Sequence, residues 1–238
     1  SSGNPLPAPI VIGTGGRVPP TAIIEDDASG DVEAQTSFAP ASDGIDFWES
    51  LEGMRVQLNN ALVVGPTNTF SEIPVVGDNG SNASLLTGRG GIVLQPGDFN
   101  PERILLDNEI ITLPVLNVGA TFATVVGMVD YNFGNFKLEV TSYTGLNTGS
   151  LGQEPAAAAG AGQFSVATFN VENLDPGDTA RLGPLASQIV NNLRSPDILV
   201  LVEIQDNNGA VNDTVVDASA TYTALSNAIT AAGGPAYK

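Results

Sequence analysis

The 238 residues include 26 Asp and Glu against 8 Lys and Arg, which gives a formal net charge of −18, and there is no Cys and no His. This composition excludes disulfides, thiolate metal sites, a cysteine nucleophile and an imidazole general base within the chain, and it disfavours tight capture of nucleic acid by counterion release. An apolar content of 42% suffices for a folded core, and no apolar run approaches the ~18 residues of a membrane span.

Residues 1–45 are predicted to form an extended, Pro- and Gly-rich connection, in which 10–12 and 22–24 are short strand candidates. Prolines prevent regular helix and interrupt a sheet ladder; here they stand at Pro5, Pro7, Pro9, Pro19 and Pro20. The N-terminus has neither a Met nor a signal-peptide pattern, so we expect it to be an internal part of a longer protein.

Residues 46–143 are predicted to be a β-rich domain. Short apolar or alternating runs are separated by Gly, Pro, Asn and Asp turns, which favours a small barrel or a sandwich. Phe47–Glu52 is predicted to form one helical turn capped by Asp46, with Phe47 and Trp48 in the core. The strand candidates are 54–58, 62–64, 73–76, 92–94, 103–106, 122–129 and 137–140.

An Ala/Gly-rich linker is predicted over 144–163, and an α/β region follows over 164–238. Its strands are expected at 164–169 and at 198–202, the second buried on both faces because it is continuously apolar. One helix is expected to end at about residue 194, either with Asp178 or Thr179 as its cap or with its regular part beginning near Pro184, and a second helix is expected over 219–232. A sheet of two parallel strands cannot cover its own edges, so we expect further sheet from outside these residues.

Asn170 and Glu203 follow the two predicted strands of this region. Parallel strands joined by a right-handed crossover end at the same edge of the sheet, where ligands of open α/β sheets bind. A carboxylate and an amide at that edge suit Mg²⁺, which prefers oxygen ligands and needs only one or two carboxylates. An Asn that bonds a turn and a solvated Glu are the simpler interpretation of the same two residues.

Residues 164–174 and 196–206 resemble two strands of the endonuclease/exonuclease/phosphatase superfamily, whose fold is DNase I-like. The resemblance implies that Glu203 is the metal ligand and that Asn170 lies near the metal and the scissile phosphate, both counted as catalytic residues. Mg²⁺ is the cofactor it implies, with Ca²⁺ or Mn²⁺ as alternatives. The superfamily often has Gln directly before this Glu, where the present chain has Val202, so one polar contact near the metal is missing.

The upstream residues extend the resemblance to about 45–238. Residues 49–54, 90–92, 98–104 and 129–135 are similar to the β-rich, OB-like part of large secreted bacterial nucleases. The implied architecture is multidomain, with the β-rich region followed by the beginning of a DNase I-like domain. The superfamily's catalytic His and its partner Asp and Asn residues would lie further along, so we expect this fragment to be inactive and the full-length protein to cleave DNA or RNA.

Two other functions stay open from the sequence. The chain could be a non-catalytic extracellular structural or binding protein on the same scaffold. It could also belong to a phosphomonoesterase or nucleotidase, since the superfamily shares one metal site. Oligomeric state, the preference for DNA or RNA and the mode of cleavage are not encoded in these motifs.

Overall fold

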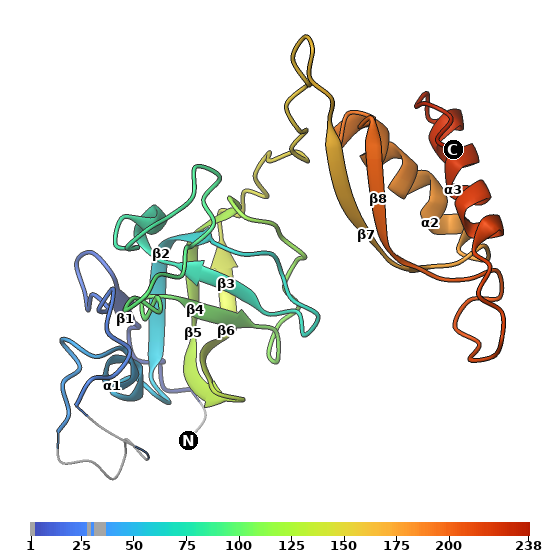
Figure 1. Ribbon diagram of the computed structural model, residues 1–238. Helices are drawn as coiled ribbons and strands as arrows, with labels where there is room; N and C mark the ends of the chain where they lie inside the picture. Colours follow the sequence, from blue (N-terminus) through green and yellow to red (C-terminus); the bar gives the residue numbers. More distant parts are fainter. Residues whose placement is uncertain (1–2, 28–29, 31–36) are drawn as a thin grey trace. The chain divides into compact units, whose positions relative to one another are not determined.

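The computed structural model describes residues 3–27, 30 and 37–238 (Figure 1). The chain divides into two compact units, Ser1–Leu151 and Gly152–Lys238. The boundary between them falls inside residues 144–163, the stretch that the sequence predicts to be a linker. Within the described ranges, none of the helices combines the length and the apolar character that crossing a membrane requires.

The first unit is a closed five-stranded β-barrel. Its strand order is β2-β3-β4-β6-β5, and β5 pairs back onto β2 to close it. All neighbouring pairs are antiparallel except β4 and β6, which are parallel. The predicted barrel is therefore confirmed over the alternative of a sandwich. The strands are β2 (Arg55–Val63), β3 (Ile73–Val76), β4 (Ile104–Asp107), β5 (Thr121–Asn132) and β6 (Asn135–Thr144).

Strand β2 is one continuous strand where the sequence predicts two. Val56 and Leu58 face the core, and after Asn60 the inward positions become Ala61 and Val63. Asn60 has a left-handed backbone, with φ of 46°, and this local turn changes which alternate residues point inward. The interrupted apolar pattern of 54–58 and 62–64 therefore reflects a change of phase, not a break in the strand.

Part of the predicted extended connection near the N-terminus pairs with the barrel and packs into its core. β1 (Ile10–Ile12) pairs in parallel with the first half of β2, and Ile12 is 2% exposed in the barrel core. The 10–12 strand is thus confirmed, whereas 22–24 forms no strand. The predicted strand at 92–94 is also wrong, since only a single bridge joins Leu86 to Ile92.

One short helix, α1 (Gly44–Glu49), packs its aromatic residues into the barrel core. Phe47 and Trp48 meet edge to face at 5.0 Å, and the Trp48 indole donates to the Pro101 carbonyl oxygen at 2.8 Å. Both aromatics are core residues, as predicted. The helix begins earlier than expected, because Asp43 and not Asp46 occupies the N-cap position.

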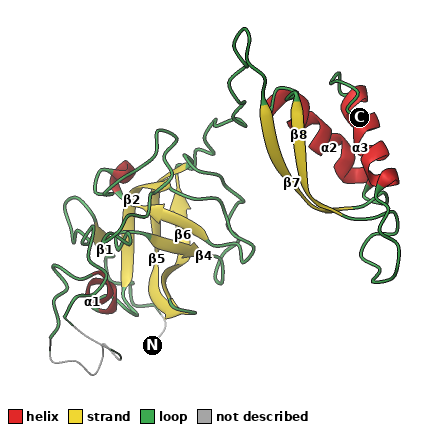
Figure 2. Ribbon diagram, in the orientation of Figure 1, coloured by secondary structure: helices red, strands yellow, loops and turns green. Residues whose placement is uncertain are grey.

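The second unit has the predicted order of strand, helix, strand and helix (Figure 2). β7 (Val166–Leu174) and β8 (Ile198–Ile204) pair in parallel, as expected. α2 (Thr179–Ser187) continues into a π-helical turn, Gln188–Asn192, and α3 (Ser219–Ala231) follows β8. The helix begins at Thr179 with Asp178 at its N-cap position, which confirms the Asp178 cap. The alternative start near Pro184 is wrong, and Pro184 lies within the helix at the cost of one backbone hydrogen bond.

Within the second unit, the two helices cover one face of the β7–β8 sheet. Phe169, Leu199 and Leu201 pack with both helices, whereas the opposite face exposes four large apolar side chains. The prediction that β8 is buried on both faces is therefore wrong for these residues. A continuous apolar run specified the strand correctly, but it does not specify what covers the second face. The exposed side chains are Val166 (59%), Ile198 (50%), Val200 (48%) and Val202 (43%).

Candidate functional site

The ends of β7 and β8 depart from regular pairing at the residues the sequence singles out. Asn170 pairs with Val202, and the next pair is Leu174 with Ile204, so β7 carries two extra residues across this step. The backbone is left-handed at Glu172, Asn173 and Glu203, with φ of 52°, 56° and 62°. L-residues adopt this region at a cost of order 1–2 kcal/mol each, and such strain persists where surrounding contacts fix it, often at functional sites.

The left-handed turn at Glu203 brings its side chain to the same face as Asn170. Regular alternation after the exposed Val202 would direct residue 203 toward the helices. Instead both Asn170 and Glu203 are exposed, and the Asn170 Nδ2 donates a hydrogen bond to the Glu203 Oε1 at 2.6 Å. The predicted meeting of an amide and a carboxylate at one sheet edge is thus observed, although the alternating pattern alone would have placed Glu203 on the other face.

Hydrogen bonds from α2 and from the residue that follows β8 hold this irregular backbone in place. Arg181 of α2 donates to the carbonyl oxygens of Val171 and Glu172 at 2.6 and 3.1 Å, and it pairs with Asp178 at 2.9 Å. The Gln205 side chain donates to the Asn173 Oδ1 at 2.8 Å. Because these contacts bind the bulge itself, they fix where Asn170 and Glu203 lie.

The donor set at this edge fits one hard cation. The Glu203 Oε2 makes no hydrogen bond within the described ranges and stands exposed beside the oxygen that Asn170 holds. The Asn170 Oδ1 accepts from the Glu172 N–H at 2.7 Å, so in this arrangement Asn170 orients the carboxylate and does not itself offer an oxygen. A single carboxylate with waters and substrate oxygens is a common Mg²⁺ coordination.

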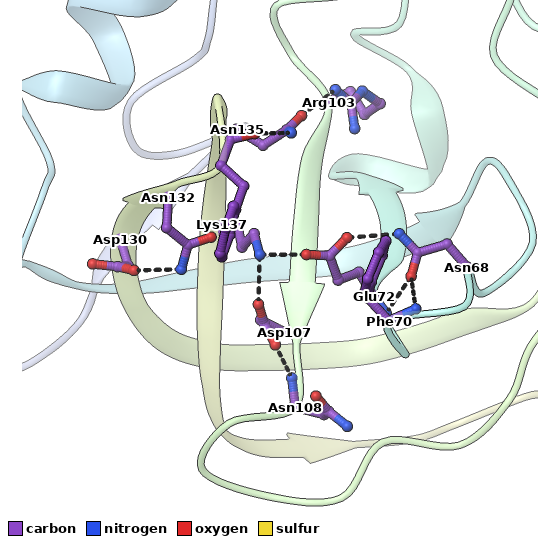
Figure 3. Close-up of polar contacts among 11 residues, drawn as sticks. Asn68, Phe70, Glu72, Arg103, Asp107, Asn108, Asp130, Asn132, Asn135 and Lys137 are labelled. Carbon is purple, nitrogen blue, oxygen red and sulfur yellow. Dashed lines mark hydrogen bonds and ion pairs between the residues drawn. The ribbon is translucent and has the colours of Figure 1, made fainter.

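A second polar site, missed by the sequence analysis, lies on the outward face of the barrel (Figure 3). Lys137 of β6 is 5% exposed and pairs with Glu72 and with the Asp107 Oδ2, the latter at 3.0 Å. The Asn68 side chain donates to the Glu72 Oε2 at 2.6 Å. Burial would raise the pKa of Glu72, but the hydrogen bonds from Lys137 and Asn68 outweigh it, and the pKa lies below its ordinary value.

Glu139 lies two residues beyond Lys137 on the same face of β6 and opposite Asp107 of β4. Burial, followed by the charges of Asp107, Asp130 and Glu109, raises the pKa of Glu139 to about 7. Its Oε2 is buried and accepts no hydrogen bond from the residues that the structure describes. Alternation along residues 137–140 could have indicated that Lys137 and Glu139 both point outward. The parallel pairing of β4 with β6, which places Asp107 beside Glu139, was not predictable from the sequence.

Comparison with known proteins classifies the barrel. Residues 11–148 match a family described as a domain of unknown function, DUF8508. The chain belongs to the DUF8508 family. No curated protein and no solved structure matches the chain.

The DUF8508 match covers β1 to β6 and contains the Lys137 network. Asn170 and Glu203 lie outside the matched residues, so membership of the family assigns no role to them. The function of the second unit therefore has to be argued from its own geometry.

Proposed function

We propose that the second unit provides the metal-binding edge of a secreted bacterial phosphodiesterase that acts on DNA or RNA with Mg²⁺. The observation that carries this proposal is the 2.6 Å hydrogen bond from Asn170 to Glu203 at the carboxyl ends of two parallel strands. Open α/β sheets bind ligands at that edge. The strained backbone at Glu172, Asn173 and Glu203, fixed by neighbouring side chains, supports a site over a solvated loop.

The two residues divide the work at this edge. Glu203 would hold the cation through its exposed Oε2, while Asn170 fixes the carboxylate by donating to Oε1. A bound Mg²⁺ polarises a phosphoryl oxygen and stabilises the charge that develops on the phosphate. The neutral amide adds no negative charge beside an incoming phosphate, which a second carboxylate would.

The chain has no His, so its residues supply no imidazole to activate water. The DNase I-like superfamily that the sequence resembles takes that base from a later part of its catalytic domain. We therefore expect the 238 residues to bind metal and phosphate groups without turnover.

The barrel is proposed to be an OB-like accessory module of the same protein. Its closed five-stranded order, with one parallel pair between β4 and β6, supports this description. OB-folds commonly bind oligonucleotides, but the outward face here carries the acids Glu72, Asp107 and Glu139 around Lys137. This charge balance disfavours a phosphate backbone, so the proposal places the phosphodiester at the second unit.

The proposal is tested by amide NMR spectra of the whole chain during a Mg²⁺ titration, followed by a short single-stranded DNA. We expect Mg²⁺ to shift the signals of Asn170 and Glu203, and the DNA to shift them further only when Mg²⁺ is present. Glu203→Gln should abolish both responses. Glu154→Gln removes the same charge from an exposed position in the same unit and should preserve them.

Three outcomes would contradict the proposal. One is the same Mg²⁺ response in the Glu203→Gln variant as in the unsubstituted chain. Another is DNA binding that persists unchanged in EDTA. The third is displacement of Mg²⁺-bound DNA by a phosphomonoester at an equal concentration, which would favour a phosphomonoesterase of the same superfamily.

A further inference from the structure

A separate group of acids lies in the first unit. Glu25, Asp27 and Asp43 each place a carboxylate oxygen within 4.8 Å of the other two. Asp43 directly precedes α1, and Glu25 and Asp27 belong to a segment well upstream in the chain. The sequence analysis did not group these residues, because the fold brings them together from opposite ends of a long connection.

The side chain of Asp43 is the unusual member of this group. It is 1% exposed and occupies the N-cap position of α1 with extended backbone, yet it makes no capping hydrogen bond. Its Oδ1 is buried without a hydrogen-bond partner in the described part of the chain, and its Oδ2 accepts a long bond of 3.3 Å from Ser42. An Asp at this position ordinarily accepts from the first helical N–H groups, so another interaction must account for its orientation.

The charges around Asp43 are of the same sign. Burial, then the charge of Asp26, raises the pKa of Asp43, and Glu25 and Asp27 raise it further, against one hydrogen bond from Ser42. A buried carboxylate among other carboxylates is unfavourable unless a cation or a proton neutralises it. An oxygen-binding metal ion would satisfy the unpartnered Oδ1 and remove the repulsion at the same time.

Backbone hydrogen bonds hold the two halves of the cluster together independently of any ion. The Gly44 and Ile45 N–H groups, at the start of α1, donate to the carbonyl oxygens of Ile23 and Ile24, both at 3.0 Å. The segment that carries Glu25 is therefore docked onto the helix start that carries Asp43. This preorganisation lowers the conformational cost of bringing the three carboxylates around one ion.

We propose that Glu25, Asp27 and Asp43 bind one Ca²⁺ ion that fastens the 25–27 segment to the start of α1. Ca²⁺ binds oxygens at 2.3–2.6 Å, so opposite ligands of one ion stand about 5 Å apart. The three carboxylate oxygens, all within 4.8 Å of one another, fit within that span. Mg²⁺ requires shorter distances of about 2.1 Å and near-ideal octahedral geometry. The remaining positions would be filled by water and further oxygens.

The experiment compares the whole chain with its Asp43→Asn variant, with and without Ca²⁺. Unfolding of the first unit is followed by the fluorescence of Trp48, the single Trp of the chain, which lies on α1. In EDTA the variant should be at least as stable as the unsubstituted chain, because it lacks a buried unpartnered charge. With Ca²⁺ the unsubstituted chain should gain stability and the variant should not, which reverses their order.

Calorimetric titration with Ca²⁺ provides the second readout. Asp43→Asn should weaken binding about tenfold or more, and the control Glu109→Gln less than about threefold, since Glu109 is exposed, lies outside the triad and is not among the charges that act on Asp43. The Glu203→Gln variant should bind Ca²⁺ at this site unchanged, which separates it from the second unit. Absence of any Ca²⁺ response up to about 10 mM, or an equal response in the Asp43→Asn variant, would overturn the proposal.

Discussion

Replacing Glu139 with Gln should stabilise the barrel, and the gain should appear only as pH rises. Burial and the neighbouring acids raise the pKa of Glu139 from 4.5 to about 7 in the folded chain. Between pH 4.5 and about 7, the folded chain therefore keeps a proton on Glu139, whereas the unfolded chain has already released it. Stability from this group is full below pH 4.5 and is lost as pH rises through about 7.

The gain in stability expected from Glu139→Gln follows from the difference between the two pKa values of Glu139. At about 1.4 kcal/mol per pH unit, the step from 4.5 to about 7 corresponds to an upper bound of about 3 kcal/mol. Mutual adjustment with Asp107, Asp130 and Lys137 will reduce it, so we expect Glu139→Gln to gain about 1–3 kcal/mol at pH 8 and close to nothing at pH 4.5.

The assay is urea unfolding at several pH values between 4.5 and 8, followed by Trp48 fluorescence. The difference between variant and unsubstituted chain reports on Glu139 together with the charges coupled to it, because titrations elsewhere are common to both. Glu52→Gln is the matched control: Glu52 is exposed and its charge is not among those that raise the pKa of Glu139, so its removal should change stability by less than about 0.5 kcal/mol. A difference that is constant with pH, or a variant less stable at pH 8, would refute the reasoning.

Two further substitutions test the contacts that fix each site. Lys137→Met leaves Glu72 and Asp107 as buried unpaired acids, so it should cost about 3–5 kcal/mol at pH 7 in urea unfolding, and a cost below 1 kcal/mol would show that the network is dispensable. Arg181→Gln removes the donors to the bulge carbonyls of Val171 and Glu172 and should weaken Mg²⁺ binding several-fold in calorimetry, with α2 still helical by circular dichroism; unchanged affinity would mean that the bulge holds its shape without Arg181.

The barrel strands and the parallel β7–β8 pair were predictable because apolar runs and turn residues encode them locally. The phase change in β2 was not, since it depends on the left-handed backbone of Asn60. The prediction that β8 is buried on both faces was also wrong. Val200 and Val202 show that this face is apolar, but the sequence does not show what packs on it. Local pattern thus specifies elements better than it specifies their surroundings.

The candidate site was predictable in position and not in geometry. Parallel strands end at one edge, so Asn170 and Glu203 were expected to be close. The spacing of the two residues did not predict the left-handed turn at Glu203 that brings both side chains to one face. It also did not predict the Arg181 contacts that hold the bulge. The buried Lys137 network and the Asp43 cluster depend on pairings between segments far apart in the chain, which single-residue patterns do not encode.

The central claim is that Glu203, held by Asn170, binds a divalent cation at the end of the β7–β8 sheet. The most direct measurement is paramagnetic broadening of amide NMR signals by substoichiometric Mn²⁺ in the whole chain, read at residues 170–174 and 202–205. The account predicts that these signals broaden in the unsubstituted chain and in Glu154→Gln, and stay sharp in Glu203→Gln. Signals that broaden equally in all three proteins, or remain sharp in the unsubstituted chain, would contradict it.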